Sequence, residues 1–204
     1  MNKLALFDFD QTLILENSLG TLFKEVSRRK RLWPLLIPEF LKGKMLRRGV
    51  RTTIKHKLYH RCLHQSDEQR LREIGQQCAD RFTINQPVFH QLSELAASGI
   101  QVWVVTASPR PFIEGVIQGL GWPVARVVGT ELLESEPGLY SGRYENECSH
   151  HHKELRLNSL FKEEGLTPEI VEAYGNLPAD RELLSMAKKG FAVKGARIRL
   201  HPKH

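Results

Sequence analysis

The stretch that decides the fold is Lys3–Ile14, which reads KLALFDFDQTLI. Its residues Leu4–Phe7 form a short, continuous apolar run, a pattern typical of a strand that is buried on both faces of a parallel sheet. Asp8 and Asp10 follow at the carboxyl end of this strand, the edge where open α/β sheets bind ligands. Side chains two residues apart on an extended chain point the same way, so both carboxylates can face one site. Two carboxylates this close repel unless a cation, a shared proton or hydrogen-bond donors separate their charges, which favours a functional pair over a polar turn.

The composition fits a globular protein with a substantial core. A chain of 204 residues has room for one domain, or for one domain with a sizeable insertion, and its hydrophobic content of 41% is ordinary. The three cysteines (Cys62, Cys78 and Cys148) are odd in number and widely spaced, so they predict no disulfide framework. We therefore expect a reducing, cytoplasmic location. Because the first predicted strand starts at the third residue, we expect no signal peptide.

The net charge of +7 is concentrated in one segment. Residues 24–61 contain thirteen Lys or Arg and two Asp or Glu, around an apolar run at 32–41. That run is far shorter than the ~20 residues that span a bilayer, and two prolines interrupt it. The segment can be read as helices with a solvated basic face, or as a patch that contacts an anionic membrane peripherally, at the inner membrane surface. No recognition motif for nucleic acid accompanies the charge, so nucleic acid is not an expected partner.

The pattern after the first strand predicts an all-helical insertion. Residues 16–84 lack strand patterning, and apolar residues recur there with helical spacing. The three helical runs lie at 19–26, 54–62 and 71–82. We therefore expect a core formed by 1–15 and 85–204, with 16–84 as a helical cap.

From Pro87 the chain alternates between helices and strands. The expected helices are 87–98, one that runs to Leu120 with Ser108 as its N-cap and Pro109 as its first residue, and one that Lys153 opens. The expected strands are 100–105, 126–129, 169–174 and 190–193, with a turn or hairpin at 138–144. This alternation predicts the α/β class, with a doubly wound, mostly parallel sheet.

Candidate site residues follow the expected strand at 100–105 and open the helix that begins at Lys153. Thr106 and Ala107 lie between a strand and a helix, where a hydroxyl and free backbone N–H groups suit phosphate. Lys153 opposes the helix dipole, so its place there needs a functional reason, and Lys162 is the alternative deeper in the helix. Cys148 and the adjacent histidines 150–152 are metal-ligand types, but three neighbouring histidines cannot converge on one ion, so we interpret them as a loop.

These residues resemble the four motifs of the haloacid dehalogenase superfamily, in the family's order. Asp8-Phe9-Asp10-Gln11-Thr12 resembles the first motif, Asp-x-Asp-x-Thr, and Gly175–Asp180 resembles the last. There are two departures: Gln11 stands where Gly is common, and Asn176 stands where the family usually has its first acidic metal ligand. Asn is an accepted variant in some branches, and its amide oxygen can still coordinate Mg²⁺ without contributing charge.

The resemblance implies a role for each motif residue. Asp8 would be the nucleophile and Asp10 the general acid and base; Thr106 with Ala107 would bind phosphate, and Lys153 would neutralise the phosphoryl oxygens. Mg²⁺ would be held by Asp8, the backbone carbonyl of Asp10, Asn176 and Asp180.

The insertion after the first motif resembles the cap of the phosphoserine phosphatase-like branch, subfamily IB. The phosphatidylglycerophosphate phosphatase C type of this branch also has a basic, apolar segment there. The resemblance implies a Mg²⁺-dependent phosphomonoester hydrolase that acts through an aspartyl-phosphate, on a lipid phosphate such as phosphatidylglycerophosphate or on another anionic phosphomonoester. A small-metabolite phosphatase and a binding protein that has lost activity are the alternatives. Phosphoserine phosphatases have a Glu nine residues after the nucleophile, where this chain has Asn17, beside Glu16. The sequence indicates no oligomeric state.

Overall fold

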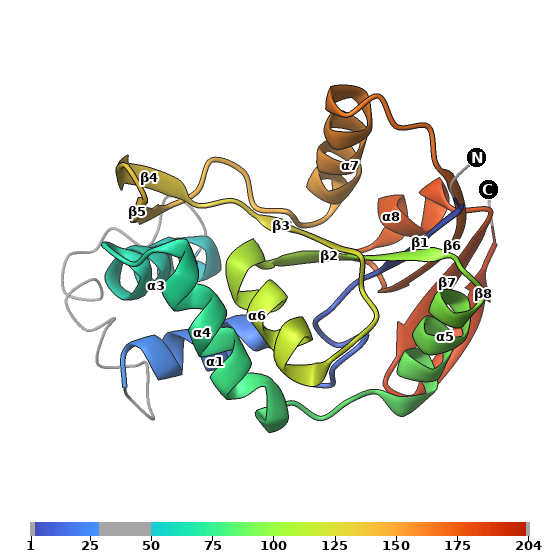
Figure 1. Cartoon of the computed structure of the whole chain (residues 1–204), viewed down its shortest axis with the longest axis horizontal. Helices are drawn as coiled ribbons and strands as arrows, with labels where there is room; N and C mark the ends of the chain where they lie inside the picture. Colours follow the sequence, from blue (N-terminus) through green and yellow to red (C-terminus); the bar gives the residue numbers. More distant parts are fainter. Residues whose placement is uncertain (1–2, 29–49, 203–204) are drawn as a thin grey trace.

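The structure, a computed structural model, describes residues 3–28 and 50–202 (Figure 1). The apolar run at 32–41 and most of the basic residues around it lie outside the described residues, so the membrane-contact interpretation of that segment stays a prediction. No helix in the described ranges is long and apolar enough to cross a membrane.

The central sheet has six strands in the order β3-β2-β1-β6-β7-β8. The strands are β1 (Lys3–Phe7), β2 (Gln101–Pro109), β3 (Arg126–Thr130), β6 (Glu169–Asn176), β7 (Lys189–Lys194) and β8 (Arg197–His201). All neighbouring strands run parallel except β7 and β8, which form an antiparallel hairpin. This arrangement confirms the predicted α/β class with its mostly parallel sheet. β1 lies inside the sheet between β2 and β6, which is why its residues form a continuous apolar run.

Helices cover both faces of this sheet (Figure 1). They are α1 (Ser18–Val26), α3 (Val50–Leu63), α4 (Glu68–Cys78), α5 (Gln86–Ala97), α6 (Arg110–Leu120), α7 (His151–Glu163) and α8 (Arg181–Met186). A 3-10 turn, η3 (Ala79–Arg81), follows α4, and β4 (Leu133–Glu136) pairs with β5 (Leu139–Arg143) in a hairpin. Apolar side chains of α5 and α6 pack on one face of the sheet, and those of α7 and α8 pack on the other. The doubly wound arrangement is therefore confirmed.

The helices of the predicted insertion lie beyond the carboxyl ends of β1 and β2, together with the β4–β5 hairpin (Figure 1). The two ends of the insertion run side by side. Leu15 N donates to the Thr83 carbonyl oxygen at 3.0 Å, and Asn85 N donates to the Leu13 carbonyl oxygen at 2.9 Å. The chain thus leaves and re-enters the α/β part at one place, although the boundaries of a separate cap stay a prediction.

Helix α4 of this insertion packs closely against α6. A Cβ atom at Gly75 of α4 would lie 2.2 Å from the Phe112 carbonyl oxygen, and one at Gly115 of α6 would lie 2.0 Å from the Arg72 carbonyl oxygen. Real Cβ contacts are not this short, so glycine is required on both helices. The contact fixes α4 to the α/β part, and one apolar core runs through both.

Candidate active site

The carboxyl ends of β1 and β6 bring Asp8 and Asp180 to one buried lysine. Lys153 Nζ donates to Asp8 Oδ1 at 2.5 Å and to Asp180 Oδ1 at 2.6 Å. Lys153 is only 3% exposed and Asp180 only 1%. A lysine is rarely buried to this extent unless carboxylates pair with it, so these three residues form one charged cluster. Thr12 Oγ1 also donates to Asp8, at 2.8 Å from Oδ2.

The cluster carries more negative than positive charge. Burial, followed by repulsion from Asp180, raises the pKa of Asp8 to about 7, although Lys153 opposes this shift. Burial alone would lower the pKa of Lys153, but the charges of Asp8 and Asp180 outweigh it and raise that pKa above its ordinary value. Lys153 is therefore a permanent cation, and it faces two carboxylates.

The Asp10 carboxylate is held by a different set of donors. Ser18 N, at the start of α1, donates to Asp10 Oδ1 at 2.5 Å, and Ser108 Oγ donates to Asp10 Oδ2 at 3.3 Å. The hydroxyls of Ser18 and Ser108 also share a hydrogen bond of 2.8 Å. Burial raises the pKa of Asp10, and the hydrogen bonds from Ser18 partly offset this. The sequence did not assign Ser18 to the site.

The prediction that Ser108 caps the next helix is wrong. Strand β2 continues through Pro109, and α6 begins at Arg110 with no hydrogen bond from a capping side chain. The physical reason is that the Ser108 hydroxyl is used by Asp10 and Ser18 instead. Pro109, predicted as the first helical residue, sits one position before the helix.

Thr106 and Ala107 lie in the same extended end of β2. Thr106 is fully buried, and its Oγ1 accepts from Ser108 N at 3.1 Å. The Ala107 carbonyl oxygen accepts from Thr130 Oγ1 at 2.8 Å and from Tyr59 OH, on α3, at 3.5 Å. This end of β2 is thus held by hydrogen bonds from β3 and from α3. The phosphate-binding roles of Thr106 and Ala107 stay predictions.

The oxygen atoms around Asn176 suit Mg²⁺. Asn176 N donates to Asp180 Oδ2 at 2.8 Å, and Asn176 Nδ2 donates to the Asp10 carbonyl oxygen at 3.1 Å. The described residues contain no cluster of three or more His, Cys, Asp or Glu that would hold an ion by itself. The donors that fit are instead the Asp8 and Asp180 carboxylates, one backbone carbonyl and one amide, all of them hard oxygen ligands. The surplus negative charge of the cluster adds a reason for a dication there.

The family model for haloacid dehalogenase-like hydrolases matches residues 5–185, which is most of the chain. The chain belongs to this family. The resemblance predicted from the four motifs is therefore confirmed.

Solved structures share the fold of this haloacid dehalogenase-like hydrolase. A protein of unknown function from Bordetella pertussis Tohama I superposes with a TM-score of 0.69 at 19% identity, over 94% of this chain and 89% of that one. A phosphoserine phosphatase in the form of a phospho-aspartyl intermediate analogue gives 0.57 at 21% identity, over 94% and 86%. A phosphoserine phosphohydrolase-like protein from Francisella tularensis subsp. tularensis SCHU S4 gives 0.57 at 20%, over 94% and 87%. These likenesses show a shared fold, whereas the phosphatidylglycerophosphate phosphatase resemblance stays a prediction. A search of curated protein sequences finds no match.

In this haloacid dehalogenase-like hydrolase, Asn17 and Glu16 both accept hydrogen bonds from groups within the chain. Asn17 is the N-cap of α1, and its side-chain oxygen accepts from Gly20 N at 3.3 Å. Glu16 uses both carboxylate oxygens on Thr83, at 3.0 Å from the backbone nitrogen and 2.5 Å from the hydroxyl. Both carboxylate oxygens of Glu16 are therefore already used within the chain.

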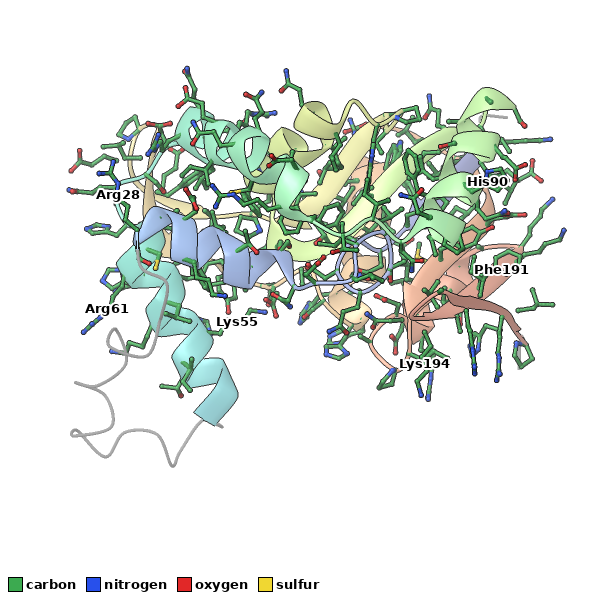
Figure 2. The ribbon with its side chains drawn as sticks, turned by 90° about the horizontal axis from the view of Figure 1, so that it is seen from below. Arg28, Lys55, Arg61, His90, Phe191 and Lys194 are labelled. Carbon is green, nitrogen blue, oxygen red and sulfur yellow. The ribbon has the colours of Figure 1, made fainter. Side chains whose placement is uncertain are left out.

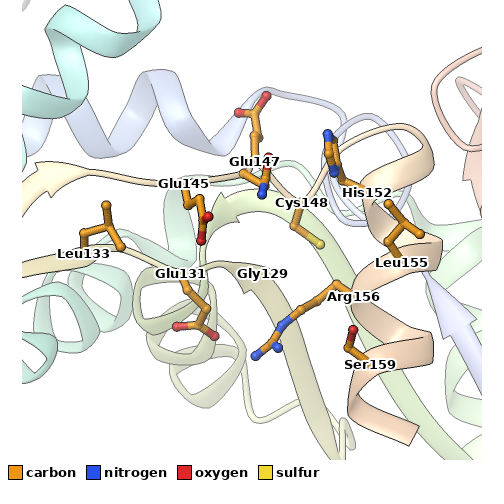
Figure 3. Close-up of a pocket in the computed structure, with 11 residues that line it drawn as sticks. Gly129, Glu131, Leu133, Glu145, Glu147, Cys148, His152, Leu155, Arg156 and Ser159 are labelled. Atoms are coloured by element: carbon orange, nitrogen blue, oxygen red, sulfur yellow. The ribbon is translucent and has the colours of Figure 1, made fainter. Parts of the chain in front are cut away.

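A cavity of about 550 Å³ lies beside the segment that leads into α7 (Figure 3). Its lining includes Glu131, Glu145 and Glu147, with Arg156 on the α7 side. Glu147 also forms an ion pair with Lys55 of α3. Asp8 and Lys153 are not part of this lining, and its acidic character disfavours a phosphate group.

Proposed function

We propose that this chain hydrolyses phosphomonoesters, with Mg²⁺, through a phosphoryl group carried on Asp8. The observation that carries the proposal is the buried cluster of Asp8, Lys153 and Asp180, with the Asp10 carboxylate held beside it by Ser18 and Ser108. The superfamily also contains dehalogenases, but these lack the second aspartate of the first motif. The presence of Asp10 therefore favours phosphoryl transfer.

The chain's own groups supply both halves of the reaction. An Asp8 carboxylate oxygen forms a bond to phosphorus while the bond to the leaving oxygen breaks, and Asp10 gives that oxygen its proton. A water molecule then attacks the aspartyl-phosphate, and Asp10 takes the proton from this water. Lys153 offsets the negative charge of Asp8 and of the phosphoryl oxygens throughout.

The metal has a defined place in this proposal. Asp8, the Asp10 carbonyl, Asn176 and Asp180 would hold Mg²⁺, which when bound would supply positive charge that offsets repulsion between the phosphate and the carboxylates. Thr106 and Ala107 would receive the phosphate at the end of β2.

Asn176→Asp is expected to lower the Mg²⁺ concentration that gives a half-maximal rate, because a carboxylate adds a charge that the amide lacks. Asp180→Ala should raise it sharply. Titration calorimetry with Mg²⁺ alone should rank the affinities in the same order, so the prediction has a readout besides activity. If Asp180→Ala leaves both the Mg²⁺ dependence and the Mg²⁺ affinity unchanged, the ligand assignment is wrong.

The substrate class we propose is an anionic phosphomonoester with apolar bulk, such as a lipid phosphate. Asn17 caps α1 and Glu16 is bound to Thr83, so neither matches the carboxylate that would meet the ammonium group of phosphoserine. An ammonium that is buried without its counter-charge costs on the order of 1–3 kcal/mol. A phosphoserine-like small metabolite is the alternative. A binding protein that has lost activity is a further alternative, because Asn176 stands where the family usually has an acidic metal ligand.

The test compares rates on an aryl phosphate, on phosphoserine and on phosphatidylglycerophosphate in micelles, at physiological Mg²⁺. It addresses both the phosphatase activity and the substrate class. We expect Mg²⁺-dependent hydrolysis of the aryl phosphate, a faster rate on the lipid and a slow rate on phosphoserine. A clear preference for phosphoserine would overturn the substrate class alone. Absence of hydrolysis of all three would overturn the enzymatic proposal and favour the binding protein.

A further inference from the structure

A groove at the β7–β8 end of the sheet has the charge of an anion-binding site. The groove has a volume of about 820 Å³ and lies between the loops that carry Gln11 and Asn176 and the β7–β8 hairpin. Lys194, Arg197 and Arg199 line it, and no Asp or Glu does. None of these three side chains has an ion pair or a hydrogen bond within the described part of the chain.

The strand register holds these cations together. Lys194 of β7 lies directly opposite Arg197 of β8, and Arg199 lies two residues further along the same face of β8. Like charges in directly opposite positions of an antiparallel pair are destabilising. Lys188, just before β7, is also exposed, but it pairs with Glu169. A bound anion would remove the repulsion between Lys194 and Arg197, and the arginines suit a phosphate.

Two exposed leucines lie on the same groove. Leu15, shortly after the first motif, is 46% exposed, and Leu177, directly after Asn176, is 43% exposed. Side chains of this size are usually buried, so two of them beside three unpaired cations favour a ligand with both an anionic and an apolar part. Figure 2 shows Lys194 well away from Arg61 of α3.

We propose that this groove binds an anionic amphiphile, with its phosphate group at Lys194, Arg197 and Arg199 and its apolar part along Leu15 and Leu177. The lining contains none of Asp8, Lys153 and Asp180, but it includes Asn176, so the groove borders the reaction centre and extends away from it to the β7–β8 hairpin. The inference does not depend on the proposed phosphatase reaction.

Titration calorimetry of the full chain with two matched probes tests this. One probe is dihexanoyl phosphatidylglycerol below its micelle concentration, and the other is glycerophosphoglycerol, which has the same phosphodiester without acyl chains. Both are diesters, so neither is a phosphomonoester substrate. We expect the dihexanoyl lipid to bind at least tenfold more tightly than glycerophosphoglycerol, and Leu15→Ser/Leu177→Ser to remove most of this difference.

Arg197→Gln/Arg199→Gln should weaken lipid binding about 30-fold, since each cation near an anionic head group contributes about fivefold. Arg143→Gln/Lys162→Gln removes the same charge from exposed positions elsewhere and should bind like the wild type. The melting temperature of Arg197→Gln/Arg199→Gln should not fall, because the substitution relieves like-charge repulsion. Sedimentation with phosphatidylglycerol vesicles then distinguishes a membrane lipid, which binds in the same order of variants, from a soluble amphiphile, which gives binding in calorimetry only.

Four results would overturn the proposal. One is equal binding of the two probes, and another is equal weakening by the groove variant and the charge-matched control. The third is a hexaglutamate peptide that binds more tightly than the lipid, which would assign the groove to an acidic protein segment. A fall in the melting temperature of the groove variant would likewise contradict the repulsion on which the inference rests.

Discussion

Replacement of Asp8 by Asn is expected to reduce turnover by at least about 10³-fold and to leave the fold intact. The reason is chemical: the amide is not a competent nucleophile, while its size matches that of the carboxylate. The fold should survive, because Lys153 keeps its bond to Asp180 and the variant removes one of two carboxylates that repel each other. Steady-state rates on an aryl phosphate and thermal melts of both proteins are the measurements.

The matched control for this variant is Asp80→Asn, which makes the same chemical change at an exposed position in the 3-10 turn after α4. Its rate should equal that of the wild type. Comparable rates for Asp8→Asn and Asp80→Asn would rule out Asp8 as the nucleophile.

Replacement of Lys153 by Met is expected to lower the free energy of unfolding by about 3–5 kcal/mol and to abolish turnover. The substitution keeps an apolar stem of similar length but leaves two buried carboxylates, Asp8 and Asp180, without their cation. Urea denaturation measures the stability, and the rate on an aryl phosphate measures the activity.

Two further variants separate charge from packing in this experiment. Lys162→Met, at an exposed position on the same helix, should change neither stability nor rate measurably. Lys153→Met/Asp180→Asn should recover part of the lost stability, since it removes one of the two unpaired charges. If the double variant is less stable than Lys153→Met alone, repulsion between Asp8 and Asp180 is not the cause of the loss.

The members of the charged cluster could be predicted from local pattern and from the family resemblance together. Asp8 ends an apolar strand and Lys153 stands near a helix start where the dipole disfavours it, whereas Asp180 was assigned by its resemblance to the last family motif. The carboxyl ends of parallel strands meet at one edge of a sheet, so their convergence follows from the fold class. The hydrogen-bond partners could not be predicted in the same way, because the spacing of residues along the sequence does not give the distances between their side chains in the fold.

The Ser18–Asp10–Ser108 arrangement was missed for a physical reason. The sequence separation between Asp10 and Ser108 is 98 residues, and a Ser before a Pro has the local pattern of a helix N-cap. Because a hydroxyl that can cap a helix can equally bind a distant carboxylate, the local sequence cannot distinguish the two. The sequence around Asp10 does not indicate which donors bind its carboxylate.

Strand β8 was also missed, although a pattern for it exists. Its residues alternate between charged and apolar side chains after a turn in which Gly195 has a φ of +57°, a conformation that favours glycine. The strand is short and basic, which made the tail look uninformative. It matters because it supplies Arg197 and Arg199 to the groove.

The central claim is that the phosphoryl group passes through Asp8, and the most direct test is to trap it there. The wild-type chain is mixed with an aryl phosphate and Mg²⁺, quenched in acid during turnover, digested and analysed by mass spectrometry. We predict a phosphoryl group on Asp8 within the peptide that carries the first motif, and none on the corresponding peptide of Asp8→Asn. Sustained turnover with no phosphoryl group on Asp8, or with one on a different residue, would contradict the account.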